Sequence, residues 1–227
     1  MRAMVRLGDI YKQAGMEKEY VGCLTTAVEL FAGDSNVTFE LLNILIDRVN
    51  RTRTAISEKK TELKRMRVDP ETLTENSVPS SEPMRSAALA YLEELESLDT
   101  QYNECYRLMR VSCGQIPYNA ELYYRTASLQ YLRAEEDGDR DKYKDAINWL
   151  QRAIASDSGH IESYHLIALA YEKLGDNDRA VRFWRLFEVI YEIAPEVMGK
   201  DFLTPQRESL HYEAMAHLDA LGASKEE

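Results

Sequence analysis

The sequence contains little of what interrupts long helices, with ten Gly and six Pro in 227 residues. This scarcity favours helices and argues against a β fold, which needs many turns. No apolar run approaches the ~18 residues that cross a bilayer. The N-terminus also lacks the basic-then-apolar pattern of a secretory leader. Because 44% of the residues are hydrophobic and 30% are charged, the composition predicts a folded helical protein rather than a disordered one.

Cysteine is also scarce: Cys23, Cys105 and Cys113 are odd in number, and none lies in CxxC spacing. This pattern predicts buried, reduced thiols in a reducing, cytoplasmic compartment, with one disulfide as the alternative. Met1 leads directly into a helical pattern without a capping residue. We therefore also expect the chain to be a fragment of a longer protein, and in that case the missing leader says nothing about the compartment.

Motifs of catalysis and metal binding are missing as well. The four His form no HExxH motif, the Gly residues form no phosphate-binding loop, and no GxSxG is present. Acidic clusters such as Glu93-Glu94-Glu96 are typical of a solvated helix face. We therefore expect no cofactor, no metal site and no enzymatic activity.

The clearest positive pattern lies in residues 161–195, which predict two amphipathic helices joined at Gly175-Asp176. Small and aromatic residues recur at helical spacing on one face of each helix. Small side chains let helix backbones approach, and aromatic rings fill the gaps between turns. These residues are Tyr164, Ala168 and Tyr171 in the first helix and Ala180 and Trp184 in the second. The stretch resembles a tetratricopeptide repeat (TPR), a family in which helix pairs stack into a grooved superhelix.

Two further stretches, 1–34 and 121–160, resemble the same repeat, although Tyr20 stands where the family prefers Ala. The second of them contains an acidic insertion at 135–139. The second helix of the 161–195 repeat overruns by about one turn and is expected to end at Pro195. The resemblance implies an all-α fold, a TPR-like superhelix of helix pairs.

Two long helices interrupt the repeats. Between 38 and 67, apolar residues recur every seven positions, as in a coiled-coil seam, at Leu42, Val49, Ile56 and Leu63. The companion positions turn polar later, so we expect the far end of this helix to be lightly buried. Residues 84–113 predict a second long helix, and the intervening Pro- and Ser-rich segment predicts a mobile loop. Together they predict a long antiparallel hairpin.

The tail predicts a capping helix at 204–221, which starts at Thr204-Pro205. An open stack of repeats exposes its last apolar face, and such a helix would cover that face. The expected organisation is a TPR-like unit at 1–37, the hairpin at 38–116 with its mobile loop at 69–83, two TPR-like units at 117–195, and the capping helix and tail at 196–227.

Charge is distributed unevenly along the hairpin, although the net charge of the chain is −11. Residues 38–67 hold eight Lys or Arg against four Asp or Glu, and residues 68–120 hold three against nine. Either the two helices face each other, or their charged faces are separately solvated. The basic helix at 48–67 also raises the hypothesis of nucleic-acid binding. The acidic remainder and the lack of interleaved aromatic residues argue against that partner.

In the TPR family, ligands lie in the concave groove lined by the first helix of each pair. Carried over by position, the resemblance implies a partner-binding groove formed by Leu122, Arg125, Leu129, Leu132 and Arg133 of the second unit and His165, Leu169, Glu172 and Lys173 of the third. Apolar anchors beside arginines suit an amphipathic helix or an extended peptide that carries acidic groups. The alternative is that a neighbouring helix or the tail covers the leucines.

These features favour a non-catalytic protein–protein interaction scaffold that holds a peptide or helix of a partner protein in the groove. The first alternative is a structural assembly subunit that oligomerises or docks through the hairpin at 38–113, which leaves a homo-oligomer open. The second alternative is a nucleic-acid-associated protein that acts through the basic helix at 48–67.

Overall fold

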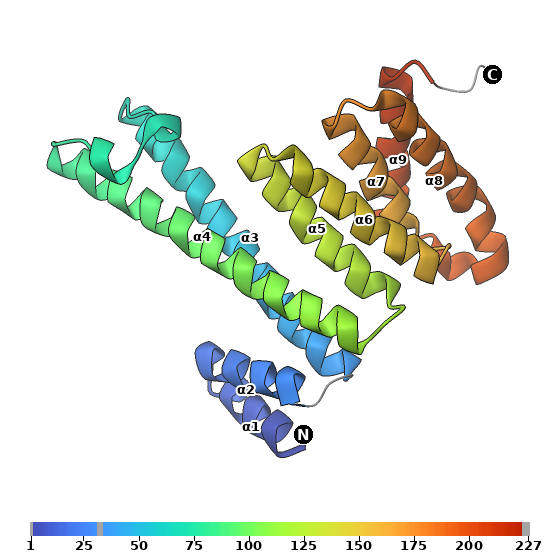
Figure 1. Ribbon diagram of the computed structural model, residues 1–227, viewed down its shortest axis with the longest axis horizontal. Coiled ribbons are helices and arrows are strands. Elements are labelled where there is room, and N and C mark those ends of the chain that lie inside the picture. Colours follow the sequence, from blue (N-terminus) through green and yellow to red (C-terminus); the bar gives the residue numbers. More distant parts are fainter. Residues whose placement is uncertain (1, 31–33, 224–227) are drawn as a thin grey trace. The chain divides into compact units, whose positions relative to one another are not determined.

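The computed structural model describes residues 2–30 and 34–223, and all regular structure in these residues is helical (Figure 1). The predicted all-α class is therefore confirmed. The chain divides into two compact units, Met1–Gln115 and Ile116–Glu227. The end of the predicted tail, 224–227, lies outside the described residues.

Each unit is a series of helices joined by short connections. The first unit holds α1 (Arg2–Gln13), α2 (Glu17–Leu30), α3 (Ser35–Arg65), the 3-10 turns η1 (Pro70–Thr72) and η2 (Glu75–Ser77), and α4 (Glu82–Gln115). The second unit holds α5 (Ala120–Asp137), α6 (Arg140–Ser156), α7 (Ile161–Lys173), α8 (Asn177–Met198), the 3-10 turn η3 (Lys200–Phe202) and α9 (Pro205–Ala220).

The pair α1/α2 packs around a contact between a glycine and a tyrosine. A Cβ atom at Gly8 would lie 3.3 Å from two ring carbons of Tyr20, which is buried. The Tyr20 hydroxyl donates a hydrogen bond to Glu40 of α3, and Lys12 of α1 pairs with the same carboxylate at 2.6 Å. The large side chain of Tyr20 thus fits because Gly8 has none, and it links the helix pair to α3.

The helices α3 and α4 form the expected long antiparallel hairpin (Figure 1). The seam residues Leu42, Val49 and Leu63 are fully buried. From α4, the buried side chains include Tyr102, Cys105 and Met109. Lys59 of the basic helix pairs with Glu94 of α4 at 2.9 Å, so the oppositely charged helices do meet at this point.

None of the three cysteines, all of which lie within the described residues, forms a disulfide. Cys23 and Cys105 are buried, as predicted, whereas Cys113 is half-buried. Burial raises the pKa of the Cys105 thiol to about 12. Cys105 is therefore a neutral thiol at physiological pH and contributes to the core as a small apolar side chain.

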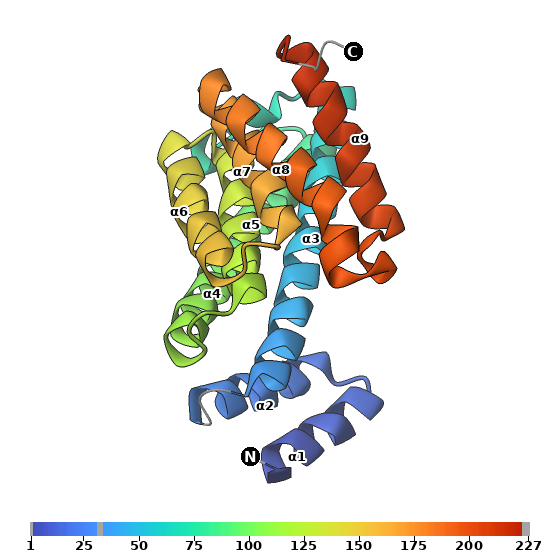
Figure 2. The same cartoon turned by 90° about the vertical axis from the view of Figure 1, so that its right-hand side faces the viewer.

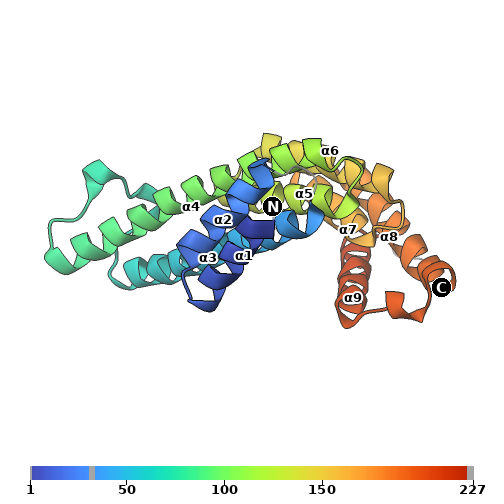
Figure 3. The same cartoon turned by 90° about the horizontal axis from the view of Figure 1, so that it is seen from below.

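The far end of the hairpin has a small core of its own, against which residues of the connection between α3 and α4 pack. Figure 3 shows this connection at the end of the two helices. Leu63 is fully buried in a cluster with Ala88 and Tyr91, and Leu73 and Val78 of the connection pack against this cluster. The side chains of residues 57–67 are otherwise half-buried or exposed, as expected for this end of the helix, and Leu63 is the buried exception. Leu63 is buried because the turns η1 and η2 of the connection return apolar side chains to the tip. The mobility of this loop stays a prediction.

The second unit contains the antiparallel pairs α5/α6 and α7/α8, followed by α9, which lies beside α8 (Figure 2). Trp184 is fully buried, and its ring contacts His165 of α7 and His217 of α9, both at 5.0 Å between centroids. The small residues of the core have no exposed surface and let the backbones approach. They include Ala127, Ala146, Ala153, Ala168 and Ala180.

Two features of this unit refine the predicted boundaries. The acidic insertion at 135–139 lengthens α5, which continues to Asp137 and is capped by Gly138 at a φ of 67°. The helix α8 does not end at Pro195 but continues to Met198. The predicted end is wrong because proline removes only its own N–H bond, while its carbonyl still accepts the N–H of Gly199 at 3.1 Å.

Candidate functional site

The groove residues predicted from the sequence lie on α5 and α7, the first helices of the two pairs in the second unit. Leu122 and Leu129 are 0% and 2% exposed, so they belong to the core. Leu132 and Leu169 are half-buried and present apolar surface. Of these four leucines, Leu132 and Leu169 are therefore the two that a ligand can reach in this conformation.

The two arginines of the predicted groove lie on α5, about two turns apart. The Nε atom of Arg125 lies 2.5 Å from Oε1 of Glu121. The Nε atom of Arg133 lies 3.5 Å from Oδ2 of Asp137. The two carboxylate side chains are 45% and 43% exposed. Because ion pairs along a helix surface are weak, a competing carboxylate can displace either one.

The carboxylate of Glu121 also contacts His160, the residue that precedes α7. Nε2 of His160 lies 3.4 Å from Oε2 of Glu121, and the imidazole ring lies 5.1 Å from the ring of Tyr124. The hydrogen bond from His160, together with the hydrogen bond and charge of Arg125, lowers the pKa of Glu121 to about 2. The carboxylate therefore stays ionised and orients the Arg125 guanidinium.

On α7, the capping helix α9 engages two of the predicted groove residues. Nε2 of His165 lies 3.2 Å from Oε2 of Glu213, and burial lowers the pKa of this histidine. Glu172 accepts a hydrogen bond from the indole N–H of Trp184 at 2.5 Å. Its other carboxylate oxygen lies 2.9 Å from Nδ1 of His217. Both residues thus bind α9 of their own chain.

A third contact joins α9 to α7. Nε of Arg207 lies 2.8 Å from Oε1 of Glu162, and both side chains are largely buried. The Arg207 guanidinium also lies 4.2 Å from the centre of the Phe202 ring. The sequence analysis did not identify these α9 residues. Glu213 and His217 are spaced four apart on the predicted capping helix, but spacing alone does not show which helix they contact.

The accessible part of the predicted site combines apolar and basic side chains. Lys173 at the end of α7 pairs with Glu135 of α5 at 2.9 Å, and its side chain is 48% exposed. The half-buried or exposed members of the predicted set, apart from Glu172, are Arg125, Leu132, Arg133, Leu169 and Lys173. Such a surface can bind an apolar segment and pair with its carboxylates.

Within the described part of the chain, no three His, Cys, Asp or Glu side chains are placed to hold a metal ion. Across 2–30 and 34–223, no helix has both the length and the apolarity that crossing a membrane requires. The surface of α5 and α7 offers charged groups and half-buried apolar side chains.

Comparison with known proteins identifies the repeat. Residues 161–184 match the tetratricopeptide repeat family model, and they span α7 and the first turns of α8. The predicted resemblance to this family is therefore confirmed for this helix pair, which is of the kind that protein-interaction modules use. No curated protein matches the sequence.

Several solved structures of helical repeat proteins are similar over most of the chain. A thermophilic TPR protein of Thermus thermophilus, TTC0263, is 18% identical, with 96% of this chain and 98% of that chain covered and a TM-score of 0.40. MamA is 17% identical, with 86% and 93% covered and a TM-score of 0.39. The TPR2AB domain of yeast Sti1, in a complex with pHSP90, is 14% identical, with 91% and 95% covered and a TM-score of 0.38.

Proposed function

We propose that the second unit is a non-catalytic binding module that holds an acidic helix or extended peptide of a partner protein along α5 and the open part of α7. The observation that carries this proposal is the pair Arg125 and Arg133. The Arg125 and Arg133 side chains are 26% and 18% exposed, and each guanidinium lies beside a carboxylate that is more than 40% exposed. The arginines are thus oriented but can be engaged by another acid.

The spacing of the two arginines defines the kind of ligand. Eight residues of α-helix correspond to about 12 Å, which matches two acidic side chains about two turns apart on a partner helix. In binding, the partner's carboxylates replace Glu121 and Asp137 at the two arginines. Glu121 keeps its contact with His160, and Asp137 keeps its ion pair with Lys142. Leu132 and Leu169 contribute the apolar contact that holds the segment in place.

The test is a selection of short random peptides displayed on phage against the whole chain, followed by affinity measurements by fluorescence anisotropy. The selected peptides should be rich in Asp and Glu. The variant R125A/R133A should bind them about tenfold or more weakly, because both charge-assisted contacts are lost. The matched control is R85A/R110A, which removes the same charge from exposed positions on α4 and should bind like the wild type.

Two outcomes contradict this proposal. The first is a selection that enriches basic or uncharged peptides. The second is an R125A/R133A variant that binds the selected peptides as tightly as the control does, which would place the ligand on another surface.

The nucleic-acid alternative loses support from the contacts of the basic helix. Arg48 and Arg51 both pair with Glu17 of α2, at 3.2 and 3.3 Å. Lys59 pairs with Glu94, as described above. These cations are partly neutralised by carboxylates of the same chain, which weakens the field that a phosphate backbone needs. These contacts therefore favour the binding of a protein segment over the binding of nucleic acid.

A further inference from the structure

The outward face of α8 carries an exposed apolar stripe. Leu186, Val189 and Ile193 are 41%, 46% and 51% exposed. They follow Arg182 and precede Glu196 at alternating spacings of four and three residues, which is the spacing of a coiled-coil seam. The opposite face of α8 is the one that packs in the core, through Trp184 and Phe187 among others.

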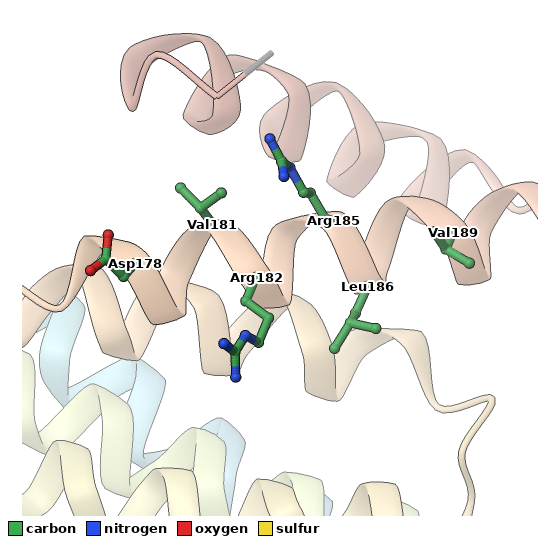
Figure 4. Close-up of a pocket in the computed structure, with 6 residues that line it drawn as sticks. All are labelled: Asp178, Val181, Arg182, Arg185, Leu186 and Val189. Atoms are coloured by element: carbon green, nitrogen blue, oxygen red, sulfur yellow. The ribbon is translucent and has the colours of Figure 1, made fainter. Parts of the chain in front are cut away.

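A shallow hollow of about 380 Å³ follows this face along α8. Figure 4 shows its lining: Arg182 and Leu186 point to one side of the helix, Val181 and Arg185 point to the other, and Val189 continues the line. All of these residues come from one helix, so the hollow is open along its length. It suits a second helix lying on α8 better than it suits a small molecule.

The charges at the two ends of the stripe indicate which helix fits. Arg182 lies near the N-terminal end of α8 and Glu196 near its C-terminal end, and both are exposed. Neither makes a hydrogen bond or an ion pair with any of the described residues. In an antiparallel pair of identical helices centred on Val189, Arg182 of each copy lies opposite Glu196 of the other. A parallel pair would instead place like charges together.

We propose that the outward face of α8 binds the same face of a second copy of this chain, antiparallel and centred on Val189. The three apolar side chains form the seam, and two Arg182–Glu196 pairs close its ends. The seam spans about 21 Å of helix, which is short for an interface, so we expect a dimer with a dissociation constant on the order of micromolar. This proposal uses none of the α5 and α7 residues and is independent of the proposed ligand site.

The first test measures mass by sedimentation velocity and light scattering over a range of concentrations around micromolar. The wild-type chain should shift from a monomer of 26.1 kDa towards a dimer as its concentration rises. Val189→Glu should stay monomeric, because it places two carboxylates at the centre of the seam. Leu89→Glu on α4 is the matched control, since Leu89 is 47% exposed and Val189 is 46% exposed. The control should dimerise like the wild type.

The second test exchanges the end charges. Arg182→Glu and Glu196→Arg should each weaken dimerisation by about tenfold, because like charges then face each other. The double variant R182E/E196R should restore it, since opposite charges again meet. All these positions are exposed, and thermal melts should show unchanged folding.

A monomer at every concentration would overturn the proposal. So would a dimer that Val189→Glu leaves intact, or one that Leu89→Glu breaks, which would place the interface on the hairpin. If the single charge variants weaken the dimer and R182E/E196R does not restore it, the antiparallel register is wrong.

Discussion

A helix pair is covered by a further segment of its own unit at two places in the molecule. The connection between α3 and α4 covers the tip of the hairpin, and α9 covers the pair α7/α8, but the two covers differ in chemistry. At the tip, Leu73 and Val78 of a short connection pack over Leu63. At the α9 end, carboxylates and histidines join the helices, as in the contact of His217 with Glu172. The first cover is mainly apolar, with one ion pair between Lys60 of α3 and Glu71 of the connection. The second cover combines packing with contacts between carboxylates and histidines.

The difference has a physical consequence. Apolar burial depends on area and is insensitive to protonation. Contacts between carboxylates and imidazoles change with pH, because histidine titrates near neutrality. The contacts that hold α9 therefore depend on pH near neutrality, whereas the apolar packing at the hairpin tip does not. Three predictions test this contrast.

The largest effect is expected from truncating the most buried side chain of each region. Trp184→Ala should lower the free energy of unfolding by about 3–5 kcal/mol, and Leu63→Ala by about 2–4 kcal/mol. The Trp184 variant should be worse because it also leaves Glu172 without the indole donor. Hydrogen exchange read by mass spectrometry should show lost protection in α7–α9 for the first variant and at the tip for the second. Equal loss in both regions for either variant would show that they unfold as one unit.

These two residues also show how far the sequence could predict the structure. The small and aromatic pattern around Trp184 predicted the helix pair correctly, because that packing is local and recurs at helical spacing. Leu63 was predicted as a seam position, but the segment that covers it was not. Its cover comes from Leu73 and Val78, which stand in a segment rich in polar residues and Pro, and no periodicity shows that such a segment folds back.

The candidate site was predictable to a smaller extent. The position of Arg125 and Arg133 on one helix follows from their spacing on α5. The spacing does not show whether a neighbouring helix covers a given position, because such cover depends on contacts between elements far apart in the sequence. His165 meets Glu213 across such a distance. The repeat pattern therefore locates the helices but leaves the accessible surface undetermined.

An intermediate effect is expected from pH, and it should be confined to the second unit, which contains all four His of the chain. Burial lowers the pKa of His165, although the nearby charge of Glu213 opposes this effect. Below about pH 6.5, the unfolded chain therefore takes up a proton that the folded chain resists. The stability that neutral His165 contributes is fully present above that pH, and it is lost as the pH falls towards the lowered pKa of His165.

The measurement is urea unfolding followed by tryptophan fluorescence at about pH 7.5 and pH 5.5. Both Trp residues lie in the second unit, so the signal reports on that unit alone. His165→Phe keeps a ring against Trp184 but removes the titrating group, and its stability should fall less between the two pH values. The same pH dependence in the variant and the wild type would show that His165 does not cause the loss.

The smallest effects are expected from the ion pairs that flank the two regions. Arg207→Ala should cost about 1 kcal/mol, because its pair with Glu162 is largely buried and its guanidinium also packs on Phe202. Lys59→Ala should cost about 0.5 kcal/mol, since its pair with Glu94 is more exposed than the pair of Arg207 with Glu162. Double-mutant cycles with Glu162→Ala and Glu94→Ala measure each coupling. A larger coupling at Lys59 would reverse the comparison, because the hairpin would then depend on charge more than α9 does.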